Sequence, residues 1–100
     1  MVQFDYFETM MKVRGIRELA DNLRRMVSEL DSLMTDTSVH WRGMAASAYL
    51  KQCEQLKAEM DRSRQDLVNI ADTVQKVAET IKDADQRLAD LASTTTSIGL

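Results

Sequence analysis

The chain has 100 residues and a formal net charge of −3, from 13 basic and 16 acidic residues spread over both halves. This length predicts one small domain covering residues 1–100, and the acidic balance argues against a nucleic-acid-binding protein. Because there is no Pro and only three Gly, while strong helix formers fill much of the sequence, we expect an all-α fold.

The first residues, 1–6, mix aromatic side chains with Asp5 and lack both a basic region and an apolar run. We therefore expect no cleaved Sec signal here, and any export would use another route. Asp5, followed three residues later by Glu8, resembles a capping box and places the start of the first helix nearby.

The first predicted helix covers about residues 7–37. Apolar residues recur in it at alternating spacings of four and three, with a second apolar column beside them. The recurring positions are Ile16, Ala20, Leu23, Val27, Leu30 and Met34, and the flanking column is Leu19, Met26 and Leu33. Gly15 costs about 1 kcal/mol relative to Ala inside a helix, so a kink or a later start there is the alternative. We expect the polar run at 35–38 to end the helix, because Ser, Thr and Asp side chains compete for backbone hydrogen bonds.

A turn is predicted at about residues 38–43, around Trp41-x-Gly43, and small residues open the helix that follows. We expect Trp41 to cap the end of the hydrophobic core and Gly43 to supply a backbone conformation that other residues adopt with strain. A second role of Trp41 as a recognition surface is compatible with this. We expect His40, the only histidine, to be a solvated loop residue.

The second predicted helix covers about residues 44–92 and keeps the four-three rhythm without a slip. Such sustained heptads predict a left-handed supercoiled seam. The seam positions are Tyr49, Cys53, Leu56, Met60, Ser63, Leu67, Ile70, Val74, Val77, Ile81, Ala84, Leu88 and Leu91. After residue 92 a Ser/Thr-rich tail, 93–100, is expected to fray.

Helices of about 45 Å and 70 Å cannot bury their apolar stripes against each other alone, because the longer one extends past the shorter. We therefore predict that this helix-turn-helix hairpin pairs with another into an antiparallel four-helix bundle. The predicted pairing surface is Ile16, Leu19, Leu23, Met26, Val27, Leu30, Leu33, Met34, Tyr49, Cys53, Leu56, Met60, Leu67, Ile70, Val74 and Val77.

Catalytic chemistry has little support. One His and one Cys in different elements make neither a zinc site nor a nucleophile with its base, and neighbouring acids such as Asp83 and Asp85 point to different sides of a helix. We expect no catalytic, metal or cofactor site, and hence no enzyme. Cys53 is expected to be a buried small hydrophobe, and an interchain disulfide requires the dimer axis to pass near it.

The layout resembles the WXG family of small type VII (ESX) secretion substrates, the early-secreted-antigen-like proteins, over nearly the whole chain. The resemblance lies in a helix, a central Trp41-x-Gly43 turn and a longer second helix, with Ala45 and Tyr49 at the small and aromatic positions that follow the motif. A C-terminal family pattern of hydrophobic and acidic residues is similar to Ile81-x3-Asp85-x2-Leu88-x3-Ala92.

This resemblance implies an antiparallel four-helix bundle, formed with a second copy or with a sister WXG-type protein. It also implies secretion through a type VII system driven by a membrane ATPase, with a cytoplasmic pool before export. Members that carry the export signal often show Tyr-x3-Asp/Glu after the second helix. Here the residue four positions after Tyr6 is Met10, and the residue four positions after Tyr49 is Cys53, so neither tyrosine matches the pattern. Export would then need a composite signal, with the Trp turn beside a partner's C-terminal segment. The alternative is a helper that pairs with the helical N-terminal domain of a larger type VII toxin substrate.

Overall fold

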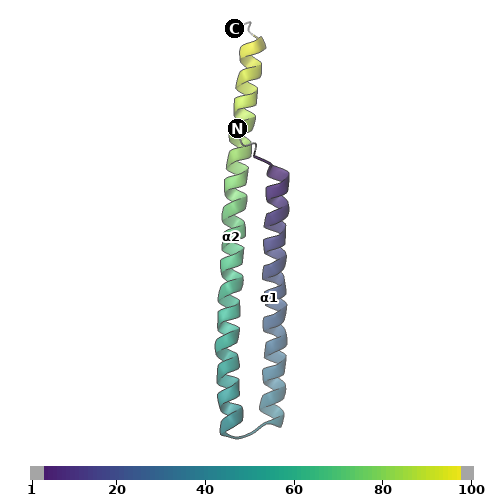
Figure 1. Cartoon of the computed structure of the whole chain (residues 1–100), viewed down its shortest axis with the longest axis vertical. Coiled ribbons are helices and arrows are strands. Elements are labelled where there is room, and N and C mark those ends of the chain that lie inside the picture. Colours follow the sequence, from purple (N-terminus) through teal and green to yellow (C-terminus); the bar gives the residue numbers. More distant parts are fainter. Residues whose placement is uncertain (1–3, 98–100) are drawn as a thin grey trace.

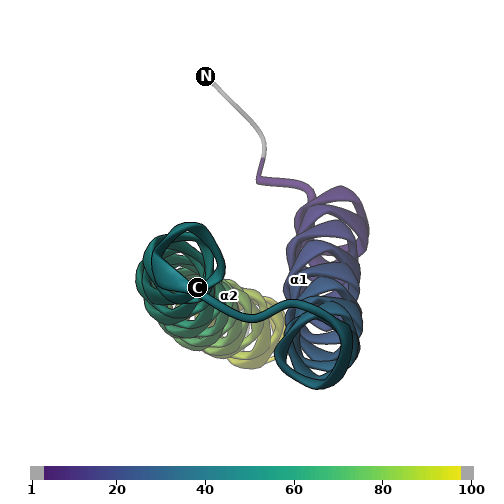
Figure 2. The same cartoon turned by 90° about the horizontal axis from the view of Figure 1, so that it is seen from below.

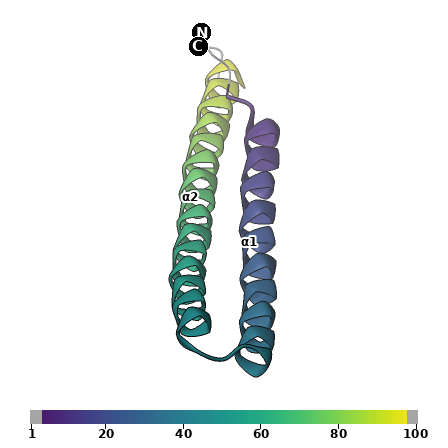
Figure 3. The same cartoon turned by 60° about the horizontal axis from the view of Figure 1, so that its bottom comes forward.

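Two long antiparallel helices make up the structure, a computed structural model that describes residues 4–97, with only the backbone given for 95–97. Helices α1 (Tyr6–His40) and α2 (Met44–Ser97) lie side by side in a rod with Cα extents of 84 × 19 × 15 Å (Figure 1). Figure 2 shows the pair from the turn end, and Figure 3 shows the turn joining the two helices. The predicted all-α hairpin is therefore confirmed for the described residues.

The start of α1 follows the predicted cap. The backbone N–H of Glu8 donates to Asp5 Oδ1 over 3.0 Å, which satisfies one of the free amides at the helix N-terminus. The helix then runs without interruption through Gly15, so it does not begin late.

Both helices extend further than the sequence predicted. α1 continues to residue 40 instead of 37, and α2 continues to residue 97, where fraying was predicted from 93; residues 98–100 lie outside the described part. The hydroxyls of Thr35, Thr37 and Thr94 donate to carbonyl oxygens four residues earlier over 3.0, 2.9 and 3.0 Å. The hydroxyl of Ser38 donates a hydrogen bond to the carbonyl oxygen of Thr35, three residues earlier, over 2.8 Å. These side chains therefore bond along the helix and do not interrupt it, which is why the predicted ends were too early.

The helices differ in length as expected. Lys82 Nζ lies 4.5 Å from the centroid of the Tyr6 ring, which places the first turn of α1 beside this part of α2. Beyond it α2 continues to Ser97 past the start of α1 (Figure 1). We call residues 85–97 the overhang.

The contact between the helices buries small side chains. Four of the seven buried residues in the described part are alanines; the seven are Val13, Ala20, Met34, Ala46, Cys53, Ala71 and Ala78. Alanine lets the helices approach closely but removes little apolar area from water. A two-helix unit with such a small core has little stability of its own.

Candidate functional site

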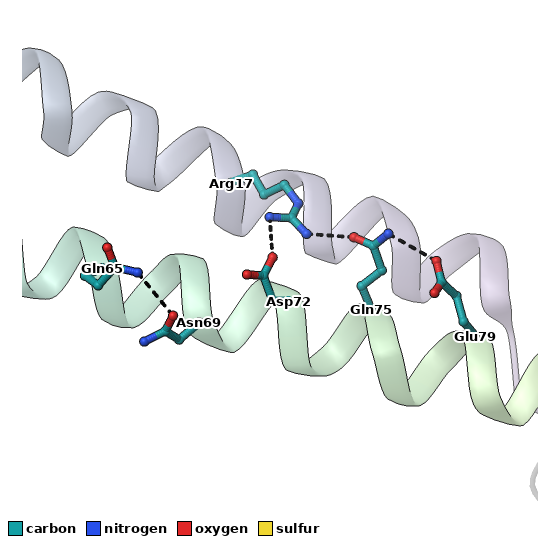
Figure 4. Close-up of polar contacts among 6 residues, drawn as sticks. All are labelled: Arg17, Gln65, Asn69, Asp72, Gln75 and Glu79. Atoms are coloured by element: carbon teal, nitrogen blue, oxygen red, sulfur yellow. Dashed lines mark hydrogen bonds and ion pairs between the residues drawn. The ribbon is translucent and has the colours of Figure 1, made fainter.

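One face of the hairpin is held together by polar contacts between the helices, and we call it the bridged face. Arg17 Nη1 lies 3.0 Å from Asp72 Oδ1, and Arg17 Nη2 donates to Gln75 Oε1 over 2.6 Å (Figure 4). Nearer the turn, Lys57 Nζ lies 2.6 Å from Asp31 Oδ1. The ion pair with Asp31 raises the pKa of Lys57.

Helix geometry then shows which residues lie on the bridged face and which lie on the opposite face. Arg17 comes four residues after the buried Val13, and Lys57 comes four residues after the buried Cys53. We call the heptad positions that contain these buried residues the central columns, namely 13, 20, 27 and 34 on α1 and 46, 53, 60, 67 and 74 on α2. On both helices, therefore, the flank four residues after the central column lies on the bridged face. In an antiparallel pair, the flank three residues after the central column lies on the opposite face.

This opposite face, which we call the apolar face, carries large hydrophobic side chains along both helices. Its α1 members are Ile16, Leu19, Leu23, Met26, Leu30 and Leu33, and its α2 members are Tyr49, Leu56, Ile70 and Val77. Seven of them are exposed, namely Leu19, Met26, Leu33, Tyr49, Leu56, Ile70 and Val77. Ser63 interrupts the α2 column with a polar residue. An apolar stripe along both helices is unusual on a soluble monomer and is typical of an interaction site.

The predicted pairing residues thus divide into two groups. Met34 and Cys53 are buried inside the hairpin, and Val27, Met60, Leu67 and Val74 are half-buried in its central columns. The other predicted residues form the apolar face. The sequence analysis did not identify Ala71 and Ala78 as the α2 positions that face α1. The sequence signal that could have identified them is a small residue four positions after a central apolar residue, with Ala71 after Leu67 and Ala78 after Val74.

The C-terminal family-like pattern lies where α2 leaves α1. Ile81 is half-buried near the start of α1, whereas Asp85, Leu88 and Ala92 are exposed on the overhang.

At the other end of the rod, the Trp turn is formed by backbone geometry. Trp41 leaves the helical conformation, with φ −112° and ψ 133°, and its N–H donates to the Thr37 carbonyl over 2.8 Å. Gly43 has φ 111°, a region that L side chains rarely adopt, and its carbonyl accepts from Ser47 N–H over 3.1 Å. This φ explains the glycine at this position.

The aromatic side chain of the turn is not buried. Trp41 is 56% exposed and meets Tyr49 edge to face, with ring centroids 5.9 Å apart and planes at 70°. The expectation that Trp41 caps a core is therefore wrong for the single hairpin, because more than half of its surface is exposed in the described structure. His40 belongs to the last turn of α1 and not to a loop. An open depression of about 390 Å³ lies at the turn end of the apolar face. Its lining residues are Asp36, Thr37, His40, Trp41 and Tyr49.

Asp36 was not identified as a site residue from the sequence, because it was assigned to a run that ends the helix. Cys53 is buried and forms no disulfide, and a hydrogen bond between its thiol and the neighbouring Tyr49 phenol raises the pKa of Tyr49. Within residues 4–97 no three His, Cys, Asp or Glu side chains gather to hold a metal ion. Neither helix, over its described length, is apolar enough to cross a membrane.

Comparison with known proteins gives a family match. Residues 2–86 match the family model WXG100, described as proteins of 100 residues with WXG. The chain is also 23% identical over 90 residues to the type VII secretion system extracellular protein A of Staphylococcus aureus strains USA300, Newman and COL. The aligned region covers 90% of this chain and 93% of each relative.

Proposed function

The chain belongs to the WXG100 family, and on that premise we propose that it is a small protein of a type VII secretion system that acts by pairing with another helical hairpin. The similarity to a type VII extracellular protein supports a secreted end point. On this proposal the chain passes through the cytoplasm before a membrane ATPase exports it. Its role is to present a surface, and no catalytic step is assigned to it.

The apolar face is the observation that carries the proposal. The hairpin buries mainly alanines between its own helices, while larger side chains such as Leu56 and Ile70 stay half-exposed on one side. Covering that face with a second hairpin would remove the exposed parts of these larger side chains from water, which favours pairing. The partner that fits is a second copy, a sister WXG-type protein or the helical N-terminal domain of a larger secreted substrate.

Export itself is tested in a host that carries the type VII system. We expect the chain in the culture medium when the ATPase is active and only in the cell extract when the ATPase is deleted. Release that does not depend on the ATPase would contradict the proposal.

The Trp turn is tested by Trp41→Ala against Val39→Ala, which removes another exposed apolar side chain from the end of α1. We expect both variants to keep their helical circular dichroism, and only Trp41→Ala to lower export. Equal export of the two variants would remove the turn from the recognition surface.

A further inference from the structure

The depression at the Trp turn presents aromatic rings to a ligand from two directions. The Trp41 and Tyr49 planes meet at 70°, so a side chain entering beside them can lie on the face of one ring and against the other. Aromatic faces carry partial negative charge and attract cations placed over them. The rings come from opposite sides of the turn, Trp41 after α1 and Tyr49 from the second turn of α2.

The acidic side chain of Asp36 completes the lining. In the described part of the chain Asp36 makes no ion pair or side-chain hydrogen bond, whereas Asp31 on the same helix binds Lys57. Arg42, which lies in the turn itself, does not line the depression. The site therefore combines two aromatic rings with a carboxylate that forms no ion pair within the described part of the chain.

We propose that this depression binds an arginine side chain of the protein that covers the apolar face, an inference that rests on the proposed pairing function. A planar guanidinium can stack on Trp41 while its N–H groups donate to the Asp36 carboxylate, a combination for which a lysine ammonium is less suited. Tyr49 is itself a member of the apolar face. A partner that covers this face therefore also reaches the depression.

The test uses the full chain and the fluorescence of Trp41, the only tryptophan in the sequence. The chain is titrated with N-acetyl-arginine amide and, as a matched control, with N-acetyl-citrulline amide, which is neutral and nearly the same shape. We expect a saturable change in emission with the arginine probe and none over the same range with the citrulline probe. Equal responses to both probes, or no saturable response to arginine, would overturn the proposal.

Substitutions then locate the site. Asp36→Asn should weaken arginine binding by about three- to five-fold, the factor that a surface ion pair contributes. Asp83→Asn, which removes an exposed acid from α2 far from the turn, should leave binding unchanged. Binding that is as tight in Asp36→Asn as in Asp83→Asn would refute the role of this carboxylate. Circular dichroism confirms that each variant is folded, and the comparison of the two probes needs no variant.

The result is separable from the proposed function. A chain that binds arginine but reaches the medium without the type VII ATPase keeps the depression and loses the export role. A chain that is exported by the ATPase but gives no arginine response loses only the depression.

Discussion

Truncating Ile70 should weaken pairing while leaving the hairpin folded. Ile70 lies on the apolar face, is 50% exposed and comes three residues after the central Leu67. It does not face α1, and Ala is the strongest helix former, so Ile70→Ala preserves α2. Its effect should appear almost entirely in association.

The size of the effect follows from the exposure. Full burial of an isoleucine side chain is worth about 1.5–3 kcal/mol, and half of that remains to be gained when a partner covers the face, about 1 kcal/mol per chain. In a symmetric pair the substitution acts twice, giving about 2 kcal/mol. The dimer dissociation constant should therefore rise about 30-fold.

The matched control is Met11→Ala. Met11 is 70% exposed but lies with Arg14 and Arg17 along the bridged side of α1. Sedimentation of both variants over a dilution series gives their dissociation constants. We expect an increase for Ile70→Ala alone, and equal values for the two variants would refute the assignment of the pairing face.

Three further experiments, using four substitutions, test the fold. Gly43→Ala should lower the free energy of urea unfolding by about 1–3 kcal/mol, because Gly43 has a φ of 111°. Gly15→Ala should raise it by about 1 kcal/mol, because Gly15 lies inside a helix. A Cβ at either site meets nothing within 4 Å, so an equal change in unfolding free energy for both variants would contradict the claim that backbone conformation causes the difference. Ala71→Leu should lower stability by about 1–3 kcal/mol by forcing the helices apart, and an unchanged melting temperature would contradict that close contact. Because Asp31 raises the pKa of Lys57, their ion pair stabilises the fold fully below the ordinary pKa of 10.5, and this stabilisation is lost as the pH rises through the raised pKa. The melting temperature should therefore fall less between about pH 9 and pH 12 in Lys57→Gln than in the parent chain.

The hairpin itself was predictable because its signals are local. Heptad spacing and helix-forming composition indicate two helices, and the glycine and tryptophan between them mark the turn. The helix ends were less predictable, because Thr35 and Thr94 can bond either along a helix or across a turn, and the sequence does not choose between these.

Periodicity alone could not show which apolar column packs against the other helix of the hairpin and which stays on the open apolar face. Cys53 and Ile70 belong to the same four-three pattern, yet one is buried within the hairpin and the other is half-exposed. The choice depends on Ala71 and Ala78, whose small size lets α1 approach that flank and leaves the larger side chains outside. The depression at the turn was missed for a related reason, since Asp36 meets Trp41 and Tyr49 only after the chain has reversed direction.

The most direct test of the account is the mass of the purified chain in solution, measured by light scattering alone and with the protein encoded beside it. We predict a folded species of twice the 11.4 kDa chain mass, or a stable complex with that neighbour, and in either case Ile70→Ala should shift the equilibrium toward free chains. A cooperatively folded monomer of 11.4 kDa that binds neither itself nor the neighbour would contradict the claim that the apolar face exists to be paired.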